Sequence, residues 1–288
     1  MMKLQLALDL VNIPEGIALV KEVEQYIDIV EIGTPIVINE GLHAVKAMKE
    51  AFPNLQVLAD LKIMDAGGYE IMKAAEAGAD LITVLGATND STIKGAVAEA
   101  KKQNKQVLVD MINVPNLEQR AREVDSLGVD YICVHTGYDL QAEGQSPFED
   151  LQTIKKAVKN AKTAVAGGIK LETLPEVIKA QPDLVIVGGG ITGQADKAKV
   201  AAEMQRLVQQ GQVDDSEMQA MAEHILAAEQ IFVAGAGRSG LMGKAFAMRL
   251  MQMGLRGLLL SMDALVLTMM QMKNMTGADM FGRHANLE

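Results

Sequence analysis

The sequence predicts an α/β protein in which residues 1–210 form a (β/α)8 barrel and residues 211–288 form a short, mostly helical segment. Short apolar runs alternate with helical patterns about every 25 residues along the first segment. Glycines such as Gly78 and Gly128 follow several helical patterns, as helix C-caps do. This alternation indicates βαβ units and a parallel sheet. Eight such units in about 210 residues fit a barrel better than an open doubly wound sheet, which is the alternative.

Each expected strand is a short run rich in leucine and β-branched residues. The eight runs begin near Leu4, Asp28, Gln56, Asp80, Gln106, Asp130, Thr163 and Asp183. The segments between them carry apolar residues at helical spacing, for example Ile71, Ala74 and Ala75. We therefore expect a helix after each strand.

The composition excludes several classes of function. A net charge of −10 and the absence of tryptophan argue against a nucleic-acid interface, which needs a basic face and stacking aromatics. No run of about 18 apolar residues is present, so no membrane span is expected. The single cysteine, Cys133, lies in an apolar run and is expected to be a buried thiol in a reducing compartment. With no signal peptide in the sequence, we expect a cytoplasmic protein.

Polar residues collect where the expected strands end. In a barrel these ends meet at one mouth, where the chemistry of this fold occurs. The residues at the ends are Asp9, Glu31, Asp60, Lys62, Asp110 and His135. Asp60 and Lys62 are two positions apart and should share one face of an extended strand. A structural salt bridge explains that pair alone, but the whole set is better explained by an active site.

Glycine turns follow the seventh and eighth strands, in Ala166–Ile169 and Val187–Thr192. Such turns let backbone N–H groups approach a phosphate, although tight turns alone are the alternative. The residues therefore indicate a barrel enzyme for a phosphorylated small molecule. Glu31 and Asp60 suit a hard cation such as Mg²⁺, and the cation with Lys62 could stabilise an enediolate. His135 suits proton transfer near neutral pH.

Five motifs occur in order at a spacing that resembles the 3-hexulose-6-phosphate synthases, a family within the orotidine-monophosphate-decarboxylase suprafamily of barrels. The motifs are Ala7–Asp9, Glu31–Pro35, Asp60–Asp65, Val134–Asp139 and Val165–Ile169. The resemblance implies a Mg²⁺-dependent aldol addition of formaldehyde to ribulose 5-phosphate, as in the ribulose monophosphate pathway, with Mn²⁺ as the alternative metal. It implies metal ligands Glu31 and Asp60, catalytic residues Lys62, His135, Asp65 and Asp9, and substrate- or phosphate-binding residues Asp110, Gly168, Gly189 and Gly190.

The same resemblance implies a homodimer through the barrel, in which Asp65 reaches into the partner's site. The related keto-gulonate-phosphate decarboxylases carry an arginine where this chain has Tyr138. That departure favours the aldolase over the decarboxylase.

The segment from about residue 211 begins with a polar linker, a helical pattern over 217–229 and a strand over 231–234. The turn that follows could bind a dinucleotide, but no acidic residue ends a second strand at the usual distance. The segment instead resembles 6-phospho-3-hexuloisomerase, a sugar-isomerase (SIS-type) domain, with a second phosphosugar site at Gly235, Arg238, Ser239 and Gly240. Since most of the SIS sheet is absent, we expect residual or lost isomerase activity. Its methionine-rich helices are expected to support further association.

Two other functions stay open at this point. A related barrel decarboxylase or epimerase would act on a phosphorylated sugar acid or a pentulose. A non-catalytic sugar-phosphate-binding module would use the turn that begins at Gly235. Such a module has no need of Asp60, Lys62 and His135 together, which weighs against it.

Overall fold

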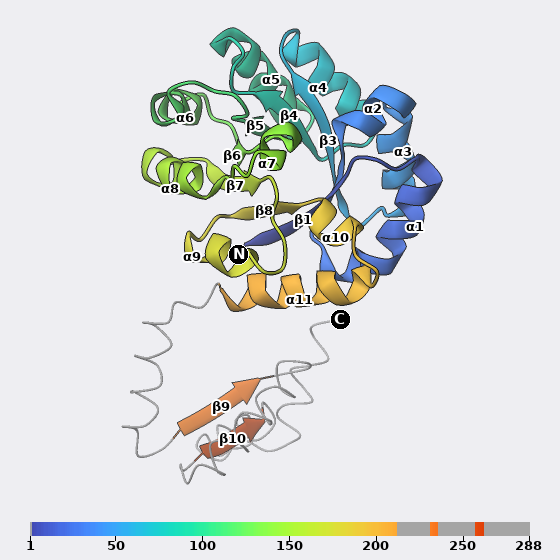
Figure 1. The fold of residues 1–288 in the computed structure, drawn as a ribbon, viewed down its shortest axis with the longest axis vertical. Coiled ribbons are helices and arrows are strands. Elements are labelled where there is room, and N and C mark those ends of the chain that lie inside the picture. Colours follow the sequence, from blue (N-terminus) through green and yellow to red (C-terminus); the bar gives the residue numbers. More distant parts are fainter. Residues whose placement is uncertain (1, 212–230, 236–256, 262–288) are drawn as a thin grey trace, which may run out of the picture. The chain divides into compact units, whose positions relative to one another are not determined.

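The computed structural model describes residues 2–211, 231–235 and 257–261 of the chain. The chain divides into two compact units, Met1–Val213 and Asp214–Glu288. In the first unit, eight parallel strands close in the order β1 to β8, with β8 pairing with β1 (Figure 1). The predicted (β/α)8 barrel is confirmed, and the open-sheet alternative is wrong.

Strands and helices alternate along the whole unit. The strands are β1 Lys3–Leu8, β2 Ile29–Ile32, β3 Gln56–Ile63, β4 Leu81–Leu85, β5 Gln106–Asp110, β6 Tyr131–His135, β7 Lys162–Ala166 and β8 Leu184–Val187. The helices are α1 Ile13–Val23, η1 Glu24–Tyr26, α2 Thr34–Glu40, α3 His43–Ala51, α4 Gly67–Glu76, α5 Asp90–Lys102, α6 Leu117–Asp125, α7 Tyr138–Ala142, α8 Phe148–Ala157, α9 Leu174–Lys179, α10 Gly189–Thr192 and α11 Lys197–Gln210.

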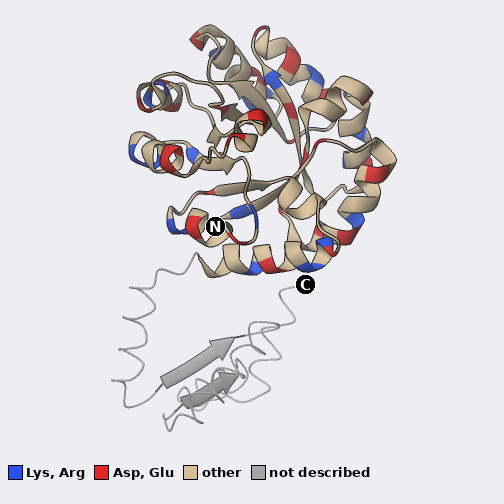
Figure 2. Cartoon of the chain, in the orientation of Figure 1, with Lys and Arg blue, Asp and Glu red and all other residues tan. Residues whose placement is uncertain are grey.

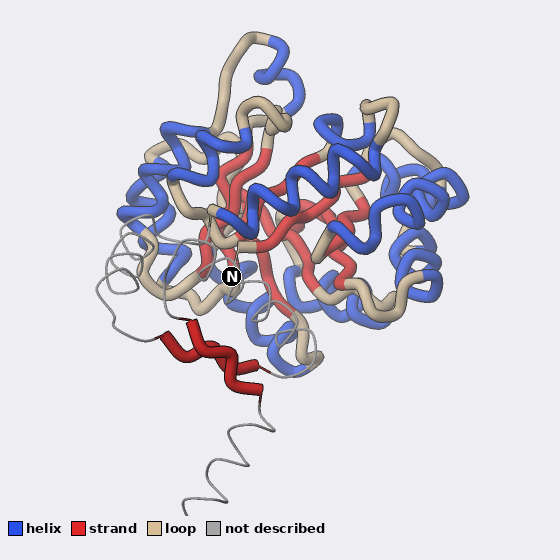
Figure 3. The backbone as a smooth tube through the Cα atoms, turned by 90° about the horizontal axis from the view of Figure 1, so that it is seen from below, coloured by secondary structure: helices blue, strands red, loops and turns tan. Residues whose placement is uncertain are grey.

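The longer helices surround the strands, as two perpendicular views show (Figures 1 and 3). One cluster of buried apolar side chains fills the space between helices and strands, and a second fills the interior of the barrel. Charged residues of both signs are interspersed along the outer helices (Figure 2). Among the helices that the structure describes, none is long and apolar enough to cross a membrane.

Inside the barrel, inward-facing residues from alternate strands form layers of four, as is usual in this architecture. The register of the strands gives these layers, from the amino ends to the carboxyl ends, as Ile29/Leu81/Tyr131/Leu184, Gln5/Leu58/Leu108/Ala164, Glu31/Thr83/Cys133/Ile186 and Ala7/Asp60/Asp110/Ala166. Ionisable groups therefore accumulate towards the carboxyl ends of the strands, where the predicted site lies.

At the opposite end, an aspartate precedes each even-numbered strand and caps the odd-numbered strand beside it. In each case a carboxylate oxygen accepts a hydrogen bond from a backbone N–H at the start of that strand. The pairs are Asp28 with Leu4 at 2.8 Å, Asp80 with Val57 at 3.0 Å, Asp130 with Val107 at 2.9 Å and Asp183 with Thr163 at 2.8 Å. These carboxylates satisfy strand amides that would otherwise lack a partner, which explains why these runs begin with aspartate.

In the second unit, β9 Ile231–Gly235 pairs in parallel with β10 Gly257–Ser261. The predicted strand over 231–234 is confirmed, and Gly235 is its last residue. The predicted helix over 217–229 lies outside the described residues, as do Arg238, Ser239 and Gly240.

Candidate active site

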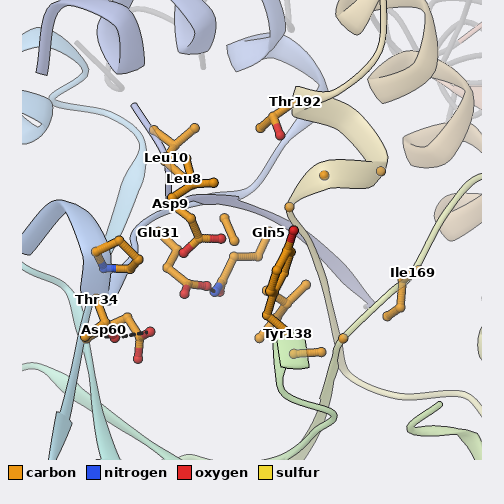
Figure 4. A pocket seen from close by; sticks show the side chains of 18 of the residues that line it. Gln5, Leu8, Asp9, Leu10, Glu31, Thr34, Asp60, Tyr138, Ile169 and Thr192 are labelled. Carbon is orange, nitrogen blue, oxygen red and sulfur yellow. Dashed lines mark hydrogen bonds between the residues drawn. The ribbon is translucent and has the colours of Figure 1, made fainter. Parts of the chain in front are cut away.

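A cavity of about 1100 Å³ opens at the carboxyl ends of the barrel strands. Its floor includes Gln5, Leu58 and Leu108, and its walls carry ionisable side chains and two glycine turns. Figure 4 shows Asp9 and Glu31 beside Gln5, with Asp60 near Thr34. The sequence-predicted residues that line this cavity are Asp9, Glu31, Asp60, Lys62, Asp110, His135, Gly168, Gly189 and Gly190.

An irregularity in β3 positions the Asp60–Lys62 pair. The register between β3 and β4 shifts between Ala59 and Ile63, and Lys62 has a φ of 48° in the left-handed region. The backbone N–H of Lys62 donates to Thr83 Oγ1 at 2.9 Å instead of continuing a regular ladder. The expectation of a regular extended strand at this point is therefore wrong. The two side chains nevertheless meet, because Lys62 Nζ donates a short hydrogen bond to Asp60 Oδ2.

Asp60 is almost fully buried, and its two carboxylate oxygens are held by neighbours. Thr83 Oγ1 donates to Oδ1 at 2.7 Å, and Thr34 Oγ1 donates to Oδ2 at 2.8 Å. Burial raises the pKa of Asp60, but the charge and hydrogen bond of Lys62 and the two hydroxyl groups outweigh it, so the pKa lies below its ordinary value. Asp60 is therefore an anion at neutral pH.

A chain of polar contacts runs from Lys62 to His135 through Asp110. Lys62 Nζ lies 3.9 Å from Asp110 Oδ2, and the same oxygen lies 2.8 Å from His135 Nδ1. Asp110 Oδ1 accepts from the backbone N–H of Ile112 at 2.9 Å, which fixes the carboxylate. Burial lowers the pKa of Lys62, but Asp60 and Asp110 outweigh it and raise the pKa. Lys62 is thus a fixed cation. The other ring nitrogen of His135, Nε2, has no hydrogen-bond partner in the described part of the chain.

Glu31 is buried below Asp60 and Asp9, 8% exposed. Gln5 Nε2 donates to Glu31 Oε2 at 2.5 Å. Burial, followed by the charges of Asp60 and Asp9, raises the pKa of Glu31 well above its ordinary value. Partial desolvation at the mouth, followed by the charge of Asp60, likewise raises the pKa of Asp9. Glu31 and Asp9 therefore resist ionisation, in part because other carboxylates lie close to them.

This donor set fits a magnesium-type ion in one particular way. Within residues 2–211, no three Asp, Glu, His or Cys side chains are close enough to enclose a metal ion by themselves. Mg²⁺ is commonly held by one or two carboxylates, with water and substrate oxygens completing its shell. Glu31 and Asp60 supply two carboxylates beside open cavity space, and the closeness of these carboxylates favours a cation there.

The two glycine turns approach each other closely at the rim of the cavity. Gly167 and Gly168 have φ values of 111° and 66°, which glycine adopts without strain. A Cβ on Gly190 would lie 2.3 Å from the carbonyl oxygen of Ile169, so only glycine fits between the turns. Gly189 differs, because a Cβ there would meet nothing within 4 Å. Its position therefore allows a side chain to be added without a clash.

The structure does not bring Asp65 to this cavity. Asp65 follows β3, is exposed, and is absent from the cavity lining. Tyr138 lines the mouth but is 81% exposed, and Figure 4 shows its ring opposite Asp9 and Glu31. Cys133 is buried in the cavity wall, as predicted, and burial followed by the charge of Asp110 raises its thiol pKa well above the ordinary value.

Sequence reasoning missed three polar residues that hold the carboxylates: Thr34, Thr83 and Gln5. Thr83 and Gln5 lie inside apolar strand runs and interrupt them with a polar side chain. A polar residue at an inward-facing position of an apolar strand was the feature of the sequence that could have identified Thr83 and Gln5.

The fold and this cavity are typical of a (β/α)8-barrel enzyme. A family model matches residues 2–204. The chain belongs to the Orotidine 5'-phosphate decarboxylase / HUMPS family. It is 78% identical over 210 residues to a 3-hexulose-6-phosphate synthase of Bacillus subtilis (strain 168), covering 73% of this chain and 100% of the relative. It is 60% identical over 200 residues to that of Staphylococcus haemolyticus (strain JCSC1435), covering 69% and 95%.

A crystal structure of 3-hexulose-6-phosphate synthase from Salmonella typhimurium is similar, with 46% identity and a TM-score of 0.72, covering 73% of this chain and 100% of that one. The predicted resemblance of the barrel to the 3-hexulose-6-phosphate synthases is confirmed. The predicted isomerase-like segment begins after the matched residues 2–204.

The raised pKa of Glu31 generates a prediction about stability. In the cation-free protein the pKa of Glu31 is higher when folded than when unfolded. The contribution of Glu31 to the free energy of unfolding is therefore fully present below the pKa that Glu31 has in the unfolded chain. That contribution is lost as pH rises through the pKa that Glu31 has in the folded protein. Glu31→Gln, which stays neutral, should raise the free energy of unfolding in EDTA at pH 8 by about 1–3 kcal/mol, with the gain shrinking towards pH 5.

Denaturant unfolding at several pH values measures this difference. Glu24→Gln, at an exposed position of η1, is the matched control and should change little. A Glu31→Gln protein that is less stable than the unaltered chain at pH 8 would contradict the assignment of Glu31 as an uncompensated buried carboxylate.

Proposed function

We propose that the barrel catalyses the aldol addition of formaldehyde to ribulose 5-phosphate, which gives 3-hexulose 6-phosphate. The observation that carries this proposal is the contact chain Asp60–Lys62–Asp110–His135 beside Glu31 in one cavity. The 78% identity to a 3-hexulose-6-phosphate synthase supports this substrate pair over that of a decarboxylase or epimerase.

Glu31 and Asp60 hold Mg²⁺ in this proposal, with Mn²⁺ as the alternative. When bound, such an ion supplies Lewis-acid polarisation of the sugar's carbonyl and hydroxyl oxygens. The protein's contribution is to keep Asp60 ionised through Thr34, Thr83 and Lys62. Asp60 is thus ready as a ligand at neutral pH.

The proton chemistry falls to Lys62 and His135. Removal of a proton from C1 of ribulose 5-phosphate leaves an enediolate, and C1 then forms a bond to the formaldehyde carbon. The formaldehyde oxygen takes up a proton as its double bond opens. His135, oriented through Nδ1 by Asp110, moves protons at Nε2, and the Lys62 ammonium stabilises the negative oxygen. Asp9, with its raised pKa, is a further proton-holding group at the mouth.

The glycine turns bind the phosphate group in this proposal. Backbone N–H groups at Gly168, Gly189 and Gly190 approach the cavity without side chains between them and the ligand. Asp110, whose carboxylate contacts His135, also binds sugar hydroxyls in this proposal. The phosphate thereby sets which end of the sugar faces the carboxylates.

Two parts of the proposal concern assembly. Asp65, exposed beyond β3, contributes to the site of a partner chain in a homodimer through the barrel. In this proposal the segment after residue 211 carries residual or lost 6-phospho-3-hexuloisomerase function at Gly235, Arg238, Ser239 and Gly240. Its methionine-rich sequence supports further association.

The proposed reaction is tested by consumption of formaldehyde with ribulose 5-phosphate. The unaltered chain should condense the two with Mg²⁺ and stop in EDTA. Glu31→Gln and Asp60→Asn should each lower kcat by about 100-fold or more, because each removes a charged cation ligand. Glu172→Gln, at an exposed glutamate, is the control. Full activity of both variants in EDTA would refute the metal assignment, and no condensation by the unaltered chain would refute the reaction.

The phosphate assignment is tested at Gly189, where a side chain fits without a clash. Gly189→Asp places a carboxylate next to the expected phosphate, and like-charge repulsion should raise the KM for ribulose 5-phosphate by about tenfold or more. Gly189→Ala adds the Cβ without the charge and should leave KM within about twofold. Initial-rate kinetics of both variants measure the difference. Equal KM values for the two would mean that the phosphate binds elsewhere.

A further inference from the structure

Gln5 is a buried polar residue in an apolar layer of the barrel. It lies in the middle of β1, is 0% exposed, and shares its layer with Leu58, Leu108 and Ala164. Removing an amide from water costs free energy unless its hydrogen bonds are replaced. An apolar side chain at this position would match the other members of the layer. Packing alone therefore does not account for a glutamine here.

The amide of Gln5 is only half satisfied by the protein. Nε2 donates to Glu31 Oε2 at 2.5 Å. Oε1 is buried and has no hydrogen-bond partner within the described residues. With a cation bound, Glu31 is an ionised carboxylate and only accepts hydrogen bonds, so the nitrogen is then the atom that faces it. The unpaired oxygen lies on the other branch of the same amide, in a residue that lines the floor of the cavity.

Gln5 contacts Glu31 at one carboxylate oxygen only. Oε2 accepts from Gln5, and among residues 2–211 no hydrogen bond reaches the other oxygen, Oε1 of Glu31. Groups that orient a metal-binding carboxylate commonly act through such a contact to its second oxygen.

We propose that Gln5 is a positioning residue that fixes the carboxylate of Glu31 for a divalent cation. This inference rests on the proposed function, because it takes Glu31 as a cation ligand. It adds a requirement on Gln5, in the layer of the barrel beneath Glu31.

The experiment measures binding of Mn²⁺ alone to the full chain by electron paramagnetic resonance, without substrate. Gln5→Met keeps the side-chain length and removes both hydrogen-bonding atoms. Its Kd for Mn²⁺ should rise by about 10–100-fold. Leu81→Met, in the apolar layer below and outside the cavity lining, is the matched control and should bind as the unaltered chain does.

A second measurement separates positioning from a purely structural role. Circular dichroism and thermal unfolding in EDTA should show that Gln5→Met is folded, and raising Mn²⁺ should restore part of its lost condensation rate. Unchanged Mn²⁺ affinity in folded Gln5→Met would overturn this inference while leaving the proposed reaction intact. Absence of Mn²⁺ binding by the unaltered chain would overturn both. Weakened affinity together with partial recovery at high Mn²⁺ supports the role proposed here.

Discussion

The contact between Lys62 and Asp60 is the interaction on which the rest of the mouth depends. A buried carboxylate is costly unless a positive charge and hydrogen bonds compensate it. Asp60 receives that compensation from Lys62, Thr34 and Thr83. Lys62 in turn keeps its proton because Asp60 and Asp110 surround it. Removing either member of the pair would leave the other as an uncompensated charge in the barrel.

The pair requires an irregular strand. Lys62 has a φ of 48°, and the register of β3 against β4 shifts around it. Backbone strain of this kind costs free energy and tends to occur at functional sites. Here the distortion gives the backbone N–H of Lys62 a side-chain acceptor, Thr83, whose hydroxyl also holds Asp60. One threonine thereby connects the irregular backbone to the buried carboxylate.

The two ends of the barrel use aspartates in different ways. At the amino ends, Asp28, Asp80, Asp130 and Asp183 accept hydrogen bonds from strand amides. At the carboxyl ends, Asp60 and Asp110 face the cavity and contact Lys62 and His135. The first four are only partly buried, whereas Asp60 and Asp110 are buried and lie beside open cavity space. The chemistry proposed for the barrel therefore lies at one face.

The periodicity of the sequence was enough to predict the barrel, because eight alternating units have few other ways to bury their strands. The same reasoning located Asp9, Glu31, Asp110 and His135, since the ends of parallel strands meet at one mouth. It could not predict the distortion at Lys62, which depends on packing between β3 and β4. It also missed Gln5 and Thr83, because a single polar residue in an apolar run does not reveal its partner. Asp65 shows a related limit, since a residue expected to act in a partner chain lies outside the cavity of its own chain.

The central proposal is that Lys62, Asp110 and His135 act together at C1 of the sugar. They help to remove a proton from C1 and stabilise the negative charge that remains. The most direct measurement is exchange of the C1 proton of ribulose 5-phosphate with deuterium from D2O, followed by proton NMR without formaldehyde. The account predicts exchange at one C1 position with the unaltered chain, and its loss in Lys62→Met with the fold intact by circular dichroism. Condensation of formaldehyde by a chain that shows no C1 exchange, or full exchange in Lys62→Met, would contradict the account.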